Sequence, residues 1–306
     1  MIYLMFCLGL ALLVGGGEVL VNSGIKLANR LRLPPLVVGI VLMGFGTSLP
    51  ELSASLSALS ANPPVPGIAF GNIIGSNISN ILFILGISAV ISPVRIDRAG
   101  FRRDGLFLII SVLMLGLVMW FGRLDSVIGV FFILFILGYF VVCYDKTPEP
   151  QTQHLPHKKE TPFWVLCLLS VLGITAIVYG ANLLVESATE IALAWGVKES
   201  VFGLTLLAFG TSLPELTVSV VAAVHKQSAV AYGNIIGSNI ANVFVIVGAM
   251  GLYKSVLVPQ LWTSFWIMVA TTLAMIICGL YQKIPRWAGF LFLIAYGGYI
   301  YYLFQL

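Results

Sequence analysis

The sequence predicts an all-α membrane protein whose ten transmembrane helices form two five-helix repeats of inverted topology. Three observations support this prediction: long apolar runs, a duplicated pair of motifs, and lysine and arginine residues that gather in alternate loops. Hydrophobic residues make up 59% of the 306 positions and charged residues only 9%. A soluble domain has roughly a quarter of its residues charged, so this chain belongs in a lipid bilayer. The net charge of +4 fits a topology signal better than a nucleic-acid partner.

Apolar runs near twenty residues recur along the chain, and each can cross a hydrocarbon core about 30 Å thick as a helix. The breaks between them place ten predicted helices, at approximately residues 3–24, 36–60, 68–92, 105–121, 124–143, 164–189, 200–224, 229–252, 258–281 and 286–304. The only long polar stretch, Tyr144–Phe163, predicts a linker between the fifth and sixth helices. The chain is therefore expected to divide into a first repeat (1–143), this linker (144–163) and a second repeat (164–306).

Lysine and arginine gather on one side of this helix map. Thirteen of the sixteen lie in loops that follow odd-numbered helices, and the other three are Arg123, Lys198 and Lys254. Cytoplasmic loops carry an excess of these residues, so the thirteen are expected to face the cytoplasm. Both termini should then lie outside the cell and the central linker inside.

Two motifs occur twice in the chain. The segment MGFGTSLPEL at Met43–Leu52 returns as LAFGTSLPEL at Leu207–Leu216, and GNIIGSNI at Gly71–Ile78 returns unchanged at Gly233–Ile240. Because each predicted half has five helices, an odd number, the second half must enter the membrane from the opposite side. Inverted repeats of this kind place a substrate site near the midplane, where broken helices meet.

The first motif places an acid inside the membrane in each half. Glu51 and Glu215 fall well inside predicted helices, and a carboxylate there costs at least a few kcal/mol. An isolated acid could be held by a hydrogen bond to a neighbouring helix, but its repetition in both halves favours a functional site. Helical spacing adds hydroxyl oxygens on the same face, from Thr47, Ser48, Thr211 and Ser212.

Proline follows the hydroxyls in each copy of this motif. Pro50 and Pro214 cannot donate a backbone hydrogen bond, and their rings crowd the carbonyl groups of Gly46 and Gly210. The helices are therefore expected to loosen here and to expose carbonyl oxygens as further ligands.

The second motif adds amide oxygens. Ser76 and Asn80 share a helix face one turn apart, as do Ser238 and Asn242. These pairs could bind an ion, or they could only form hydrogen bonds between helices.

All of these candidate ligands are oxygen atoms, which suit Ca²⁺ with its six to eight ligands and other hard cations. Soft metals would need thiolate or imidazole, and the three histidines fall in predicted loops. Two ionised glutamates are neutralised by one Ca²⁺, or by two or more Na⁺ or protons. An empty site would leave both charges poorly compensated, which leads to the hypothesis of obligatory exchange.

Two other classes remain as alternatives. A cation channel would need a continuous pore, which an inverted repeat with broken helices does not favour. An intramembrane enzyme would need a base, and no histidine lies within a predicted membrane segment. Both classes are therefore less favoured than a transporter.

The duplicated motifs resemble those of the calcium/cation antiporter superfamily, and specifically those of compact sodium/calcium exchangers of the prokaryotic type. The resemblance implies a multi-pass protein of a prokaryotic cell (inner) membrane that binds Ca²⁺ and Na⁺ as substrates and uses no cofactor. It implies that Glu51 and Glu215 are the central ligands and that Thr47 and Thr211 assist them. Further oxygens are expected from Ser48, Ser212, Ser76, Ser238, Asn80 and Asn242, and from the backbone at Gly44 and Ala208.

One position departs from the family pattern. Asn242 stands where many relatives have an aspartate, and the equivalent residue of the first half is also an asparagine, Asn80. The site therefore has one acid fewer, which bears on the coupling ion. Exchange of Ca²⁺ for H⁺ is the alternative to exchange for Na⁺, because burial raises the pKa of a glutamate and allows it to bind a proton.

Overall fold

The computed structural model describes residues 2–31, 33, 35–96, 98–145, 161–194, 210–303 and 305. Within these residues the chain is helical apart from short connections and four two-residue strands. The label η marks π-helical turns, in which the hydrogen bonds run one residue further along the chain than in an α-helix.

The first half of the chain contains five consecutive helical segments. They are α1 (Ile2–Leu31); the broken segment α2 (Pro35–Val38), η1 (Gly39–Gly44), α3 (Phe45–Thr47) and α4 (Leu49–Ser60); the segment α5 (Pro66–Ser79), η2 (Asn80–Ile84) and α6 (Leu85–Ile91); α7 (Arg98–Phe121); and α8 (Ser126–Asp145). Strand β1 (Val94–Arg95) precedes α7, and strand β2 (Arg123–Leu124) follows it.

The second half repeats this order. It contains α9 (Phe163–Ala194); α11 (Leu213–Val224); the segment α12 (Ser228–Ala241), η3 (Asn242–Val247) and α13 (Gly248–Tyr253); α14 (Trp262–Leu280); and α15 (Arg286–Leu303). Strand β3 (Val256–Leu257) precedes α14, and strand β4 (Lys283–Ile284) follows it. Most of the predicted linker, and the first part of the seventh predicted helix, lie outside the described residues.

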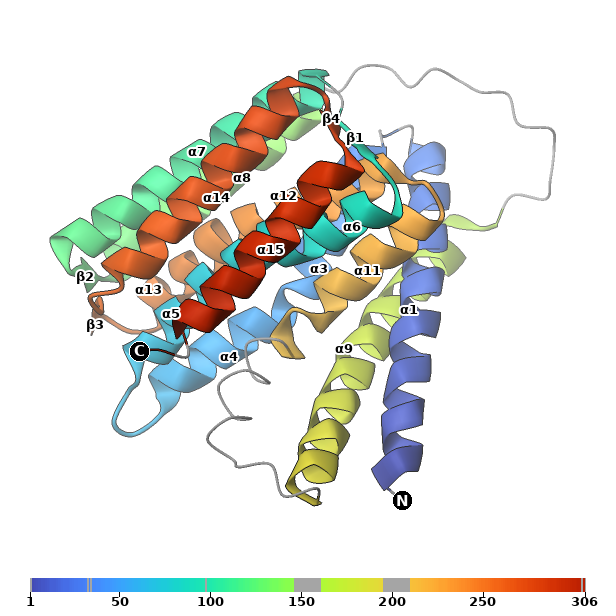
Figure 1. Cartoon of the computed structure of the whole chain (residues 1–306). Helices are drawn as coiled ribbons and strands as arrows, with labels where there is room; N and C mark the ends of the chain where they lie inside the picture. Colours follow the sequence, from blue (N-terminus) through green and yellow to red (C-terminus); the bar gives the residue numbers. More distant parts are fainter. Residues whose placement is uncertain are drawn as a thin grey trace.

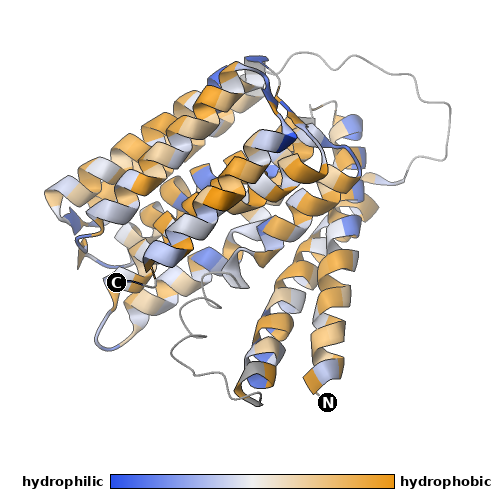
Figure 2. Cartoon of the chain, in the orientation of Figure 1, coloured by the Kyte–Doolittle hydropathy of each residue, from blue (hydrophilic) through white to orange (hydrophobic). Residues whose placement is uncertain are grey.

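Eight of the described helices are long and apolar enough to cross a membrane. Segments α11 and α15 stand at the positions of the seventh and tenth predicted helices. Figure 2 shows hydrophobic residues along the lengths of the helices and many of the hydrophilic residues at their ends. The protein is therefore an all-helical, multi-pass membrane protein.

Several helices extend beyond their predicted boundaries. Helix α1 continues to Leu31, and α7 begins at Arg98 rather than near residue 105. In α7, the buried carboxylate of Asp104 accepts hydrogen bonds from Arg103 Nε at 2.6 Å and from Tyr139 Oη at 3.1 Å. Because these charges are paired within the protein, the helix can include them. A helix boundary predicted only from apolar runs leaves out these charged residues at the start of α7.

Helices α1 and α9 stand side by side, at an angle to most of the other helices (Figure 1). An added Cβ at Gly9 would lie 2.9 Å from the carbonyl oxygen of Gly180, and one at Gly16 would lie 2.9 Å from that of Gly173. The two helices are antiparallel, because Gly9, the earlier glycine of α1, meets Gly180, the later glycine of α9. Small residues thus allow the two backbones to approach closely.

The four strands form two antiparallel pairs, each joining the two halves. Strand β1 pairs with β4, and β2 pairs with β3. The pairs lie at opposite ends of α7 (Figure 1). Since β1 and β3 hold equivalent positions in the two halves, as do β2 and β4, exchanging the halves converts one pair into the other.

Segments α5–α6 and α12–α13 are the most enclosed of the candidate spans. They carry fully buried side chains such as Phe70, Ile73, Tyr232 and Phe244. Because both copies of GNIIGSNI lie on these segments, the polar groups of that motif are held within the apolar core.

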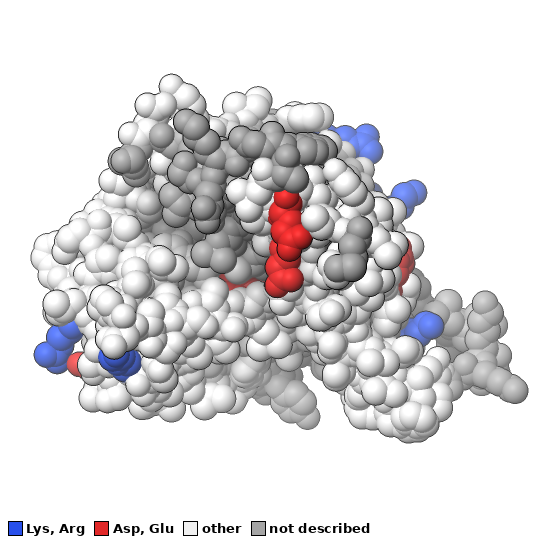
Figure 3. All heavy atoms as spheres, turned by 90° about the horizontal axis from the view of Figure 1, so that it is seen from below, with Lys and Arg blue, Asp and Glu red and all other residues white. Residues whose placement is uncertain are grey.

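Basic residues gather at one end of the helices. Nine of the eleven described lysines and arginines lie at the end that carries β1 and β4: Lys26, Arg30, Arg95, Arg98, Arg102, Arg103, Lys226, Lys283 and Arg286. Seen from below the view of Figure 1, the basic side chains lie toward the rim, whereas the largest group of acidic atoms lies nearer the middle (Figure 3). Exposed Glu186 and Glu190 lie toward the C-terminal end of α9, away from the end that carries β1 and β4.

Candidate cation-binding site

Glu51 and Glu215 lie in the first turns of α4 and α11, directly after a break in the helix. The break falls at Ser48 (φ −83°, ψ 7°) and at Ser212 (φ −86°, ψ 1°), and Pro50 and Pro214 occupy the first turn of the new helix. Proline is tolerated there because the first amides of a helix have no intrahelical partner. The predicted loosening of the helices is thus present in both halves, and it positions both glutamates in the interior.

Glu215 is fully buried and accepts hydrogen bonds from the first half and from α12. Ser48 Oγ donates to Glu215 Oε1 at 3.0 Å, and Ser238 Oγ lies 3.4 Å from the same oxygen. The other oxygen, Oε2, has no hydrogen-bond partner among the described residues. One carboxylate oxygen is therefore held in place while the second stays open.

Glu51 is 1% exposed, and within the described chain neither of its carboxylate oxygens has a hydrogen-bond partner. It interacts electrostatically with Glu215, and Thr211 lies close to its carboxylate. A buried carboxylate without donors is costly unless a cation compensates it. The surroundings of Glu51 are therefore suited to binding a cation.

The carbonyl group of Gly44 is linked to Glu215 through two serine hydroxyls that contact both groups. Its oxygen accepts from Ser48 Oγ at 2.9 Å and from Ser238 Oγ at 3.1 Å. An added Cβ at Gly44 would lie 2.8 Å from Ser238 N, so only glycine permits this approach of η1 to α12. Thr47 Oγ1 donates to Met43 O at 2.9 Å and lies 3.5 Å from Ser238 Oγ. The structure thus brings the predicted residues Gly44, Thr47, Ser48 and Ser238 to Glu215.

Two asparagines of the second motif, Asn72 and Asn234, were not predicted as functional. Asn72 Nδ2 donates to Glu51 O at 3.1 Å and to Ser55 Oγ at 3.1 Å. The equivalent Asn234 Nδ2 donates to Glu215 O at 3.1 Å and to Ser219 Oγ at 2.9 Å. Each amide therefore fixes the backbone that carries a glutamate. The signal was present in the sequence, since both stand at the second position of the duplicated GNIIGSNI.

Asn80 and Asn242 form equivalent contacts across the two halves. Asn80 Nδ2 donates to Asn239 Oδ1 at 2.9 Å, and Asn242 Nδ2 lies 3.4 Å from Asn77 Oδ1. In the part of the chain that the structure describes, the amide oxygens of Asn80 and Asn242 are buried without a partner. The interhelical bonds therefore use the amide nitrogens and leave both oxygens available.

The remaining predicted residues form no described hydrogen bond with either glutamate. Ser76 is buried in α5, but the described hydrogen bonds do not link it to a glutamate as they link Ser238. Thr211 Oγ1 lies 3.5 Å from Asn72 Oδ1, and the hydroxyl of Ser212 is buried without a described partner. Ala208 lies outside the described residues.

Two acids surrounded by neutral oxygens define the chemistry of this site. No group of three or more His, Cys, Asp and Glu side chains gathers anywhere in the described residues. Hydroxyl, amide and carbonyl oxygens would thus supply most of the ligands, which favours a hard cation over a soft one. A multi-pass helical protein with such a buried acidic site is typical of a cation transporter.

Comparison with known proteins gives the family. The model of the family "Sodium/calcium exchanger protein" matches residues 1–144 and 165–305. Sodium/calcium exchanger MaX1 of Methanosarcina acetivorans is 30% identical over 99% of both chains. An uncharacterized membrane protein of Methanocaldococcus jannaschii is 36% identical over 95% of this chain and 94% of its own.

Solved structures agree with this match. The sodium-calcium exchanger NCX_Mj, soaked with Na⁺ and Ca²⁺, superposes with a TM-score of 0.85 at 33% identity, covering 97% of this chain and 96% of that chain. The same exchanger soaked with Na⁺ and Sr²⁺ gives a TM-score of 0.86 at 32% identity, over 98% and 99% of the two chains. The chain therefore belongs to the sodium/calcium exchanger family, whose members are antiporters, and the resemblance seen in its motifs is confirmed.

Proposed function

We propose that this protein exchanges Ca²⁺ for Na⁺ across a membrane by alternating access, at a midplane site with oxygen ligands. Glu51 and Glu215 would be the central ligands, and Thr47 and Thr211 would assist them. The other proposed ligands are the side chains of Ser48, Ser212, Ser76, Ser238, Asn80 and Asn242 and the backbone carbonyl groups of Gly44 and Ala208.

The observation that carries this proposal is the pair of interacting buried carboxylates, one from each half, with three of four oxygens lacking a described partner. One Ca²⁺ carries the two positive charges that neutralise the pair of carboxylates. Two Na⁺ carry the same total charge, and three Na⁺ carry one charge more. Movement of the empty site would leave two uncompensated charges in a dry interior, which is costly. Exchange is then favoured over uncoupled transport.

Alternating access rests on ten transmembrane helices arranged as two inverted repeats, residues 1–143 and 164–306, joined by the linker 144–163. Crosswise contacts support this arrangement. Gly9 meets Gly180 while Gly16 meets Gly173, and Asn80 meets Asn239 while Asn242 meets Asn77. The strands also pair crosswise, since β1 pairs with β4 while β2 pairs with β3. Equivalent residues that meet in antiparallel order are what two halves related by a twofold axis in the membrane plane would produce.

The membrane proposed is a prokaryotic cell membrane, with both termini outside. The basic end of the molecule, at which nine described lysines and arginines lie, would face the cytoplasm. The linker would then be cytoplasmic.

The proposal is tested by ⁴⁵Ca²⁺ uptake into proteoliposomes loaded with Na⁺, in which the Na⁺, K⁺ and pH gradients are varied separately. Exchange for Na⁺ predicts uptake that requires internal Na⁺ and stops when the Na⁺ gradient is removed. Uptake that continues as an uncoupled leak would rule out obligatory exchange. Uptake driven by a pH gradient without Na⁺ would instead support Ca²⁺/H⁺ antiport.

One observation favours that second candidate. Asn242 brings an amide where many relatives have an acid, and its amide nitrogen points to Asn77 Oδ1. With two acids only, the site needs fewer monovalent ions for neutrality, and protonation of a buried glutamate is an alternative means of neutralisation.

A further inference from the structure

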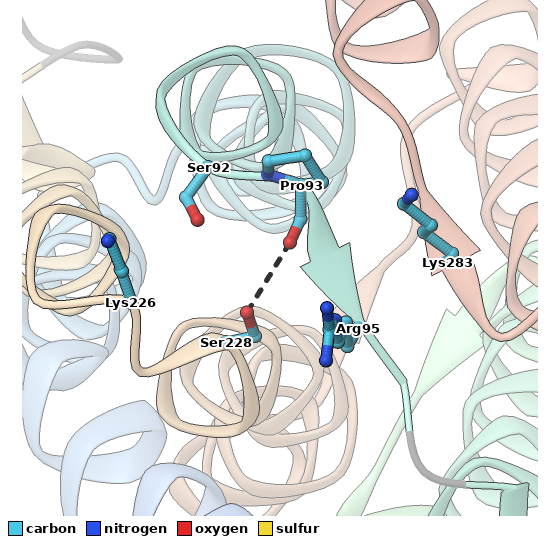
Figure 4. A pocket seen from close by; sticks show the side chains of 6 residues that line it. All are labelled: Ser92, Pro93, Arg95, Lys226, Ser228 and Lys283. Carbon is cyan, nitrogen blue, oxygen red and sulfur yellow. Dashed lines mark hydrogen bonds between the residues drawn. The ribbon is translucent and has the colours of Figure 1, made fainter.

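A basic pocket lies at the end of the molecule that carries β1 and β4, away from the buried glutamates. Its lining residues are Ser92, Pro93, Arg95, Lys226, Ser228 and Lys283 (Figure 4). Its volume of about 360 Å³ falls within the range of small-ligand sites. The lining residues come from three places in the chain: the stretch from the end of α6 through β1, the turn after α11 with the first residue of α12, and strand β4.

Two of these cations lie directly opposite each other in the strand pair. Arg95 of β1 is the register partner of Lys283 of β4. Like charges directly opposite each other destabilise a strand pair. Neither residue forms a salt bridge with a described carboxylate, and Asp97 lies outside the described residues. An anion in the pocket would turn this repulsion into attraction.

The third cation occupies an unusual backbone position. Lys226 has φ 58° and ends α11, with its amide donating to Ala223 O at 3.0 Å. Glycine or asparagine is the common residue in this left-handed position. A lysine with positive φ adopts a backbone conformation that is uncommon for residues with a Cβ, and Lys226 lines the pocket as a third cation.

Two hydroxyls complete the lining. Ser228 Oγ donates to Pro93 O at 3.4 Å, which joins the turn before α12 to the connection after α6. Ser92 lies beside Pro93 on the same side of the pocket (Figure 4). Hydroxyl donors together with Arg and Lys form a set suited to phosphate oxygens.

The equivalent strand pair at the other end of the molecule lacks this arrangement. There Arg123 of β2 faces Leu257 of β3 and forms a salt bridge with Asp125 at 3.2 Å. The near twofold relation between the halves therefore does not require the opposed cations of β1 and β4. The opposed cations occur in the β1–β4 pair and not in the β2–β3 pair, which indicates a role specific to the end that carries β1 and β4.

We propose that this pocket binds a phosphate-bearing anion, either the headgroup of an anionic phospholipid or free phosphate. Arg95 and Lys283 would hold the phosphate between them, Lys226 would close the pocket, and the serine hydroxyls would donate further hydrogen bonds. Because the lining residues come from both halves, the bound anion would stabilise their junction. The inference concerns a site separate from the proposed ion-exchange site.

The test measures the thermal stability of the purified full chain in a neutral detergent, with inorganic phosphate or phosphatidylglycerol added and with phosphatidylcholine as the uncharged comparison. The double variant R95Q/K283Q is compared with wild type and with R123Q/K254Q, which removes one arginine and one lysine from the opposite end. We expect R95Q/K283Q to bind the anion roughly 25-fold more weakly, about fivefold for each charge, whereas R123Q/K254Q should bind like wild type.

Single variants give an independent measurement. Without an anion, K283Q should unfold at the same or a higher temperature than wild type, because the repulsion from Arg95 is removed. With phosphate or phosphatidylglycerol present, the order should reverse. The uncharged change S228A should also weaken binding while leaving the repulsion unchanged.

The two anions distinguish the source. A full effect of phosphate alone would indicate a site for free phosphate, and an effect of phosphatidylglycerol alone would indicate a lipid headgroup. Equal anion binding by wild type, R95Q/K283Q and S228A would overturn the proposal. Equal losses in R95Q/K283Q and R123Q/K254Q would overturn it too, because they would show only a general effect of charge.

Discussion

Glu51 and Glu215 hold equivalent sequence positions but differ in their surroundings. Glu215 Oε1 accepts from Ser48 Oγ at 3.0 Å, whereas the equivalent donor to Glu51, the hydroxyl of Ser212, has no described partner. The local sequences around the two acids are nearly identical, so this difference arises from the arrangement of the helices. The surroundings of the two glutamates that would bind the ion are therefore not equivalent.

Replacement of either acid should remove exchange. We expect Glu51→Gln and Glu215→Gln each to lower Na⁺-dependent ⁴⁵Ca²⁺ uptake on the order of 100-fold, because removal of one charge of a buried ionic arrangement costs several kcal/mol. Glu190→Gln, a change at an exposed position of α9, is the control and should keep wild-type uptake. Full activity in either glutamate variant would remove that residue from the site.

An added acid should change the coupling. Asn242→Asp introduces a third carboxylate among buried amides, so neutrality requires one more monovalent cation for each Ca²⁺ bound. We expect a steeper dependence of Ca²⁺ efflux on external Na⁺, with the Hill coefficient rising by about one for the added charge. Gln260→Glu adds the same charge at an exposed position and should leave the steepness unchanged. An unchanged Hill coefficient in Asn242→Asp would place that side chain outside the ion site.

At the scale of the elements, π-helical turns adjoin the site in both halves. Segments η2 and η3 begin at the equivalent residues Asn80 and Asn242. Turns of this kind occur frequently at functional sites, because the extra residue shifts the side chains that follow. Apolar periodicity cannot predict them, since an insertion of one residue hardly changes the pattern. The helices themselves were predicted, but these turns were not.

The pairing of α1 with α9 depends on glycine at the contact. Gly16→Val would place a side chain against Gly173 O and Ala176 Cβ, at 2.9 and 3.0 Å for the Cβ alone. We expect destabilisation by about 1–3 kcal/mol, typical of overpacking, seen as a lower unfolding temperature in detergent. Gly15→Val is the matched control, because no described atom lies within 4 Å of a Cβ added at Gly15. Equal unfolding temperatures for the two variants would show that the close approach does not hold the pair together.

At the scale of the whole molecule, the two strand pairs lie at opposite ends of the helices. They lie at opposite ends of α7, and each joins one half to the other. The end that carries β1 and β4 holds nine of the eleven described lysines and arginines, and the opposite end holds the other two. This difference is the physical basis for an orientation in the membrane.

The orientation can be measured with introduced cysteines, after replacement of the four free native cysteines. Lys254→Cys should react with a membrane-impermeant maleimide in intact cells, because Lys254 is exposed at the end proposed to face outside. Lys283→Cys, exposed at the basic end, should react only after the membrane is permeabilised. The reverse pattern would mean that the termini lie inside.

Much of the architecture could be predicted because the bilayer restricts what an apolar run can form. Long apolar runs gave the helical segments, and the duplicated GTSLPE and GNIIGSNI motifs gave the equivalent positions of Glu51 and Glu215. The residue types of the two motifs also favoured oxygen ligands over sulfur and nitrogen ligands. These inferences need only local chemistry and the order of residues along the chain.

Only the tertiary structure decided which groups meet. The contacts of Ser48 and Ser238 with Glu215, the support of the glutamate backbones by Asn72 and Asn234, and the opposition of Arg95 and Lys283 all join residues far apart in the chain. Such contacts depend on the packing and register of whole helices and strands. A local pattern identifies the residues that can bind, but the packing determines which of their atoms remain free to do so.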